Sequence, residues 1–289
     1  MKRSKQMRDR AKKARKQLKY WLRGLKYRLF EKPIDKETRA LFLLGTGRTG
    51  STSLSRLLDL SKHITSAHEL RPKTFALSTD IYDSGRFDDP AILDAVFCGQ
   101  RLYVYNKAVR KGNLVAEISP FLSFCAPALA TAFPNSKFIY MHRHPEEFVR
   151  SAMRRGWYHN NKYDPVRLTP KAGTKDYEAW ESWPQFDKIC WLWKEYNSVC
   201  LYLYSQLADE RKMALPCADF FEDAEGSSKS IFRFLDLPMI PLEKVNKQMS
   251  VPVNAQKTGS FPKKSEWTSA QRQRLECIAG EMMMKLGYL

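Results

Sequence analysis

The chain has 289 residues, 43% of them hydrophobic, and no low-complexity linker follows residue 40, which predicts a single domain over residues 39–289. Its six cysteines are widely spread without a C-x-x-C pair, which indicates reduced, mostly core residues; Cys190 and Cys200 could pair in an oxidising compartment, but a chain of this length does not need a disulfide for stability. The formal net charge of +18 is uneven, because residues 1–30 contain thirteen Lys or Arg and one acid, leaving +6 for the other 259 residues.

Residues 1–38 are expected to form a basic amphipathic segment. Its leucines recur at helical spacing and place an apolar stripe on a cationic helix: Leu18, Leu22, Leu25 and Leu29. Three interpretations stay open: a helix in solvent or packed on the domain, a helix on an anionic membrane surface, and a nucleic-acid tail, which is the least favoured. Because no long apolar segment suits a transmembrane helix or signal peptide, we expect a cytoplasmic protein, with peripheral membrane binding through residues 1–30 as one alternative.

Residues 41–53, LFLLGTGRTGSTS, indicate a phosphate-binding loop between a strand and a helix. Glycines let the backbone approach an anion, and the free N–H groups at the start of the following helix point at it. The nucleoside-triphosphatase form of this loop has Lys directly after its last glycine, where this chain has Ser51. The cation lies inside the loop instead, as Arg48.

Apolar runs at 41–44, 101–105, 114–118 and 137–141 alternate with helical patterns and predict a P-loop-type α/β fold, a mainly parallel sheet flanked by helices. The last run ends in Arg143, and a predicted helix follows that begins near Pro145 and carries Ser151. Both candidate phosphate-binding groups therefore lie at the carboxyl ends of strands, where open α/β sheets bind ligands.

The loop, with its basic residue followed by Thr49, Gly50 and two hydroxyl residues, resembles that of sulfotransferases that use 3'-phosphoadenosine 5'-phosphosulfate (PAPS). The same family has an Arg at a strand end and a Ser eight residues later, as Arg143 and Ser151 are here. Three looser similarities follow. LVAEISPF at 114–121 resembles an element of the heparan-sulfate-like carbohydrate and bacterial branches, and a predicted strand and helix over 219–238 and the tail 257–289 resemble segments of the family in general. The resemblance covers residues 39–289.

This resemblance implies a PAPS site that needs no metal and releases adenosine 3',5'-bisphosphate. Arg48 takes the role of the family's loop lysine on the leaving-group oxygen, and Arg143 with Ser151 binds the 3'-phosphate. The implied cofactor-binding residues are Gly47, Arg48, Thr49, Gly50, Ser51, Thr52, Arg143, Ser151, Thr258, Gly259 and Ser260.

Transfer to an acceptor also needs a general base. The candidates are Glu69, His68, Glu117, His142 and His144. Glu69 is preferred, because AHELRPKTF resembles the family's K-E-x-x-F-F-like segment, and His68 is second, since imidazole titrates in the right range. We expect the other three to orient the site or face solvent.

Residues 154–193 are rich in aromatic side chains and suggest an acceptor-binding region, with Trp157, Tyr158 and His159 as substrate-binding candidates. Aromatic faces beside polar groups suit a carbohydrate or glycolipid, whereas Trp191 and Trp193 fit a core helix. The predicted function is in-line sulfuryl transfer from PAPS to a hydroxyl or amine. The alternatives are a P-loop kinase, which the absent lysine disfavours, and a non-catalytic nucleotide-binding protein associated with a membrane.

Overall fold

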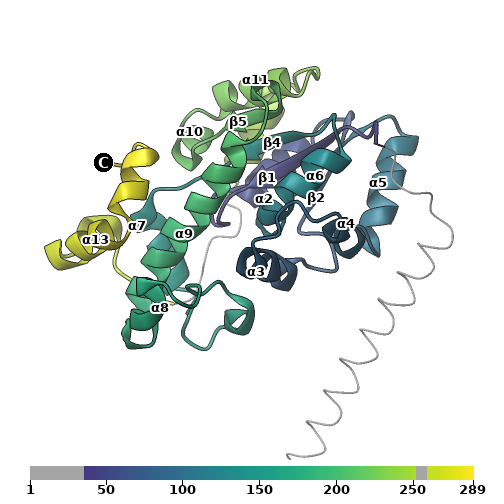
Figure 1. Ribbon diagram of the computed structural model, residues 1–289. Helices are drawn as coiled ribbons and strands as arrows, with labels where there is room; N and C mark the ends of the chain where they lie inside the picture. The colour runs from purple at the N-terminus through teal and green to yellow at the C-terminus, as the bar shows by residue number, and fades with distance from the viewer. Residues whose placement is uncertain (1–35, 252–258) are drawn as a thin grey trace, which may run out of the picture.

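The computed structural model describes residues 36–251 and 259–289, so the predicted N-terminal helix and Thr258 lie outside the described residues (Figure 1). A parallel five-stranded sheet organises the chain, with strand order β2-β3-β1-β4-β5. The strands are β1 (Ala40–Leu44), β2 (Ile64–His68), β3 (Leu114–Ile118), β4 (Lys137–Tyr140) and β5 (Lys212–Ala214). The α/β prediction is confirmed.

The strand order reverses beside β1. From β1 the chain crosses to the β2 side of the sheet, whereas from β4, the other neighbour of β1, it continues to β5. In such sheets, ligands bind outside the carboxyl ends of the strands at this switch point. The segments that follow β1 and β4 begin there, and they carry the loop 45–50 and Arg143.

Helices cover both faces of the sheet (Figure 1). Successive side chains of a strand point to opposite faces, so alternate residues of β1 belong to two hydrophobic cores, one on each face. Leu41 and Leu43 pack with the helices α2 (Ser51–Leu58), α10 (Cys217–Glu222), α11 (Ala224–Phe234) and α12 (Leu242–Met249). Phe42 and Leu44 belong to the larger core on the other face. Its helices are α3 (Phe75–Ser84), α4 (Ala91–Val96), α5 (Gln100–Arg110), α6 (Ala126–Ala132), α7 (Pro145–Met153), α9 (Gln185–Ser205) and α13 (Ser269–Lys285), and the short α8 (Lys175–Ala179) lies at its edge. No helix among the described residues is long and apolar enough to cross a membrane.

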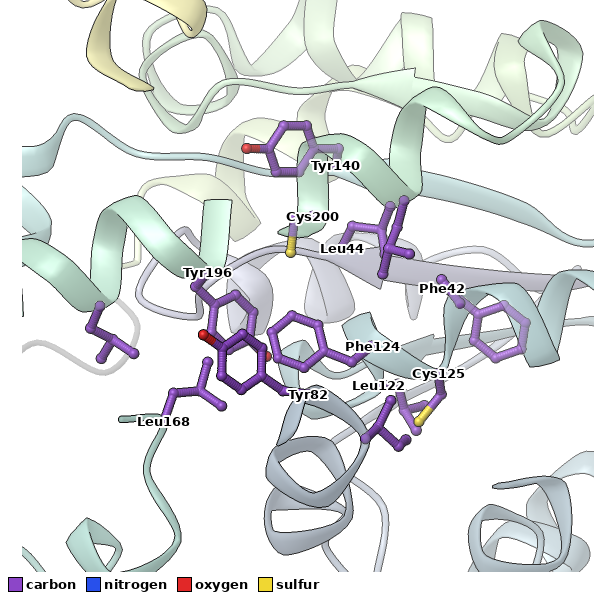
Figure 2. Packing of buried hydrophobic residues seen from close by; sticks show 14 of the residues in the cluster. Phe42, Leu44, Tyr82, Leu122, Phe124, Cys125, Tyr140, Leu168, Tyr196 and Cys200 are labelled. Carbon is purple, nitrogen blue, oxygen red and sulfur yellow. The ribbon is translucent and has the colours of Figure 1, made fainter. Parts of the chain in front are cut away.

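The larger core holds the start of the predicted phosphate-binding loop in place. Figure 2 shows Tyr82, Phe124 and Tyr196 meeting at the centre of this core, with the Phe124 and Tyr196 ring centroids 4.5 Å apart. Phe124 belongs to the 3-10 helix η1 (Pro120–Cys125), and the neighbouring Ser123 Oγ accepts a hydrogen bond of 3.0 Å from Gly45 N. Packing of α9 on η1 therefore fixes the start of the loop.

Two local predictions are wrong. The run 101–105 belongs to α5 and not to a strand, because Leu102, Tyr105 and Ala108 are buried at helical spacing and a short apolar run does not distinguish the two structures. The strand expected within 219–238 is also helical, since Cys217 and Phe220 bury one face of α10. The edge strand of this region is β5, which precedes residue 219 in the chain. The other edge strand, β2, was not predicted.

A buried ion pair joins α5 to β3. Arg101 Nε donates to Glu117 Oε1 at 2.8 Å, and both side chains have no exposed surface. Burial raises the pKa of Glu117 and nearby Arg101 opposes this shift, while Tyr105 Oη donates to its second oxygen at 3.1 Å. The same guanidinium donates to the carbonyl oxygens of Leu70 and Pro72, so this cluster supports the turn that follows β2.

The substitution Tyr105→Phe tests that cluster. Loss of the hydroxyl leaves a buried carboxylate oxygen without its donor, so we expect the free energy of unfolding to fall by about 1–3 kcal/mol. Urea denaturation measures the effect, with Tyr202→Phe, at a 60% exposed side chain, as the matched control. Equal stability of the two variants would show that Glu117 does not depend on this hydrogen bond.

Candidate active site

The loop between β1 and α2 is shaped by residues with positive φ. Arg48 has φ 60° and Gly50, which precedes the first residue of α2, has φ 96°. A Cβ at Gly50 would lie 2.9 Å from Phe221 Cε2, so both the backbone and the available space call for glycine here. The N–H groups of the first turn of α2 consequently open toward the carboxyl edge of the sheet.

The segment after β4 brings Arg143 and Ser151 to this loop. Pro145 is the first residue of α7, as predicted, and His144 caps the helix by accepting a hydrogen bond from Glu146 N. An Arg143 Nη atom donates to the carbonyl oxygen of Arg48 at 3.0 Å, and Arg48 Nε donates to Ser151 Oγ at 3.1 Å. The two motifs found in the sequence therefore form one site.

Positive charge accumulates around Arg48. Burial, together with the charges of Arg155 and Arg143, lowers the pKa of Arg48 to about 10, and Glu69 only partly opposes this shift. A cation destabilised by neighbouring cations gains most from a bound anion. The electrostatics of the loop thus favour a ligand with several negative charges.

His68 and Glu69 reach the same loop from the carboxyl end of β2. His68 Nε2 lies 3.1 Å from Ser51 Oγ and 3.3 Å from Thr52 Oγ1. Burial lowers the pKa of His68; the charge of Glu69 opposes this shift, whereas Lys73 and Arg48 reinforce it, so the imidazole is neutral at pH 7. Glu69 has φ 50° and its Oε2 lies 2.6 Å from Lys73 Nζ.

The remaining base candidates lie elsewhere. His142 Nδ1 is 2.7 Å from Tyr288 Oη, and burial lowers the pKa of His142 to about 4. His144 is engaged as the cap of α7, where burial lowers its pKa, and Glu117 is enclosed with Arg101. None of the three lines the cavities described next.

Two cavities meet at the loop. The larger has a volume of about 720 Å³ and is lined by Glu69, His68 and an aromatic group formed by Phe75, Phe121, Trp157 and Tyr163. The smaller, of about 360 Å³, is lined by Arg143, Glu147, Cys217 and Phe221 among others. Arg48, Ser51 and Thr52 line both. A group held by these three residues can therefore be reached from either side.

Comparison of the chain with models of protein families identifies its family. The model of the family described as "Sulfotransferase family" covers residues 40–241, more than half of the chain. The chain belongs to the sulfotransferase family. The family resemblance found in the sequence is confirmed, and the protein is a sulfotransferase enzyme. The carbohydrate branch stays a prediction.

Solved structures agree with this sulfotransferase in fold. The sulfotransferase domain from the curacin biosynthetic pathway is 19% identical, with 87% of this chain and 98% of that chain covered and a TM-score of 0.51. A sulfotransferase from Alicyclobacillus acidocaldarius is also 19% identical, with 85% and 93% covered and a TM-score of 0.50. No curated protein matches the chain. At such identities the likeness concerns the fold.

The three acceptor candidates of this sulfotransferase lie at different depths. Trp157 lines the larger cavity, whereas Tyr158 packs against Trp180 behind it and donates its hydroxyl to the Leu168 carbonyl. His159 is exposed and does not line the cavity. Trp191 and Trp193 are buried in α9, as the core interpretation predicted.

The segment after residue 258 packs on the end of α7. The carbonyl oxygen of Gly259 accepts from Arg154 Nε at 3.1 Å, and a Cβ at Gly259 would lie 2.1 Å from the Arg154 carbonyl oxygen. Ser260 is exposed, and neither residue lines a cavity. The described part of the chain contains no group of three His, Cys, Asp or Glu residues that could hold a metal ion.

Several lining residues of the larger cavity were not named as site residues from the sequence. Tyr163 and Arg167 lie within the acceptor region predicted at 154–193, around the 3-10 helix η2 (Asp164–Val166), whereas Lys73, Phe75 and Phe121 come from the turn before α3, from α3 and from η1. Two signals were available, since Lys73 follows Glu69 at helical spacing and Phe121 ends the LVAEISPF element. The others are brought together only by the tertiary fold.

Proposed function

We propose that this sulfotransferase transfers a sulfuryl group in line from PAPS to a hydroxyl or amine of an acceptor, with a carbohydrate or glycolipid as the leading acceptor class. One observation carries the proposal: Arg48, Ser51 and Thr52 stand where the two cavities join. In-line transfer requires the donor and the acceptor to approach one group from opposite sides. A site between two cavities meets that requirement.

The smaller cavity suits the nucleotide. Its guanidinium groups, including that of Arg143, the loop hydroxyls and the N–H groups of α2 are donors that match phosphate oxygens. Phe221, 46% exposed, offers an aromatic face on which a purine can stack. When bound, PAPS supplies the sulfuryl group and leaves as adenosine 3',5'-bisphosphate. Arg48 then holds a positive charge beside the oxygen where negative charge develops.

The larger cavity suits the acceptor. Phe75 and Phe121 stack with centroids 4.7 Å apart and Tyr163 meets Phe75 edge-on, which gives a continuous aromatic wall for a sugar face or an apolar group. Glu69 lines this cavity on the acceptor's side of the loop, where a carboxylate can accept the proton of the attacking hydroxyl.

Ligand binding and transfer test the proposal together. We expect adenosine 3',5'-bisphosphate at millimolar concentration to raise the melting temperature more than ATP does, and labelled PAPS to transfer sulfate to a member of a glycan panel. Stabilisation by ATP with magnesium-dependent ATP turnover would support a kinase instead. Binding of the bisphosphate without transfer to any acceptor would support the non-catalytic alternative.

The pair Arg143 and Glu147 gives a prediction for nucleotide affinity. Glu147 Oε2 accepts from Arg143 Nε at 2.7 Å, so the carboxylate competes with a phosphate for this guanidinium. We expect Arg143→Ala to weaken bisphosphate binding about ten- to hundredfold, and Glu147→Gln to tighten it about two- to fivefold, as a partly exposed ion pair allows.

Titration calorimetry measures both effects. Glu243→Gln, at an exposed position on α12 outside both cavities, is the matched control and should leave the affinity unchanged. Weaker binding in Glu147→Gln would mean that this carboxylate contacts the ligand and does not compete with it.

A further inference from the structure

The larger cavity is strongly cationic. Among its described lining residues, one carboxylate, Glu69, stands against six cationic side chains: Arg48, Lys73, Arg154, Arg155, Lys162 and Arg167. A neutral acceptor does not require this excess of positive charge. The aromatic wall alone would hold an uncharged ring.

Four of these cations already contact other groups of the protein. Lys73 pairs with Glu69 at 2.6 Å, and Arg167 pairs with Asp164 at 3.0 Å while its guanidinium lies 4.3 Å from the Trp157 ring centre. Arg154 donates to the backbone of the C-terminal segment, and Arg48 serves the loop. Lys162 Nζ lies 4.9 Å from the centre of the Tyr163 ring but forms no ion pair with a described carboxylate, so Arg155 and Lys162 remain as the candidates for a ligand.

Arg155 has an incomplete hydrogen-bond set. Its Nε is buried and finds no partner in the described part of the chain. A buried guanidinium nitrogen without an acceptor is costly, and Arg155 lines the larger cavity, so its guanidinium keeps hydrogen-bonding capacity that the described residues do not satisfy. Burial and the neighbouring Arg154 also lower the pKa of Arg155, which is the environment an anion would relieve.

The segment between these two cations is rigidly built. Asn161 Nδ2 donates to the carbonyl oxygen of Arg155 at 3.0 Å, which ties the residue next to Lys162 back to Arg155. Asp164 accepts from the backbone N–H groups of Tyr158 and Asn161 at 3.0 and 2.8 Å. Arg155 and Lys162 are thus presented to one cavity from a turn with fixed backbone.

We propose that the acceptor already carries an acidic group, a carboxylate or a sulfate, which Arg155 and Lys162 bind while the ring of the acceptor lies against the aromatic wall. This rests on the proposed sulfuryl transfer, because it assigns the larger cavity to the acceptor. Neither residue lines the smaller cavity, where Arg143 and Phe221 suit the nucleotide. The enzyme would then add sulfate to an anionic glycan or glycoside.

Matched ligands test the proposal with the full chain saturated with adenosine 3',5'-bisphosphate. The probes are 4-nitrophenyl β-D-glucuronide, the corresponding glucoside 6-sulfate and the neutral glucoside, which share one aromatic group and one sugar ring. We expect at least one anionic probe to bind about tenfold or more tightly than the neutral one, as a charge-assisted contact provides. Arg155→Gln and Lys162→Gln should each reduce that preference, and the double variant should remove it.

Lys229→Gln, at an exposed position on α11, removes one positive charge away from the cavity and should keep the preference. Anionic probes that bind no tighter than the neutral glucoside, or a preference that survives the double variant, would overturn the inference. So would loss of bisphosphate affinity in Arg155→Gln, because that would assign Arg155 to the nucleotide. If the wild type fails to bind the bisphosphate at all, the proposed function fails instead.

Discussion

Replacing Arg48 by alanine is expected to lower kcat for sulfate transfer by about a thousandfold or more, the range seen when an arginine that stabilises transferring phosphoryl groups is removed. Arg48 lines both cavities, and its guanidinium is oriented by Ser151 at 3.1 Å. In the proposed transfer the cation already lies where charge develops, so we expect its loss to affect the transition state more than the bound ground state. Radiolabelled sulfate transfer measures the effect.

Two further variants make this test specific. Arg48→Lys keeps the charge but loses the fork that meets Ser151, so it should recover part of the activity. Arg56→Ala, at an exposed position on α2, is the matched control and should remain active. If Arg48→Ala kept kcat within about threefold of wild type and changed only KM, Arg48 would bind substrate without stabilising the transition state.

The substitution Glu69→Gln is expected to lower kcat by about a hundred- to ten-thousandfold, the usual contribution of a general base. Glu69 lines the larger cavity beside the loop, and Lys73 holds its carboxylate. His68 is the weaker candidate, because its Nε2 already faces the hydroxyls of Ser51 and Thr52. We expect bisphosphate affinity to survive in Glu69→Gln, since this residue does not line the smaller cavity.

His68→Asn separates the two candidates under the same assay. Its main effect should fall on nucleotide binding, through the loop hydroxyls, with kcat reduced less than in Glu69→Gln. Wild-type turnover in Glu69→Gln, or a larger loss of kcat in His68→Asn, would assign the base to His68. An unchanged melting temperature of each variant without ligand shows that the chain is still folded.

The parts of the site that the sequence predicts are those made by local chemistry. Glycine with positive φ and free N–H groups at the start of a helix are consequences of a few adjacent residues, so the loop at 45–52 could be recognised directly. The same holds for the strand, proline and helix around Arg143, whose contact with the loop follows from parallel strands ending at one edge.

The failures have equally specific causes. β2 is an edge strand whose side chains are mostly half-buried, and its sequence ITSAH lacks the apolar pattern of a central strand. The run at 101–105 is apolar enough for a strand, but its burial follows the period of α5. The aromatic wall and the positive charge of the larger cavity are formed by residues from α3, η1 and the turn after α7. These segments are far apart in the sequence, so no local sequence pattern predicts that they lie together.

In the proposed mechanism Arg143 binds the 3'-phosphate of the nucleotide in the smaller cavity, so that Arg48 lies between donor and acceptor. Calorimetric titration with adenosine 3',5'-bisphosphate and with adenosine 5'-monophosphate tests it most directly, because the two ligands differ only in the 3'-phosphate. We predict that the wild type binds the bisphosphate at least about tenfold more tightly and that Arg143→Ala removes the difference. Equal affinities in the wild type, or a difference that persists without Arg143, would contradict the account.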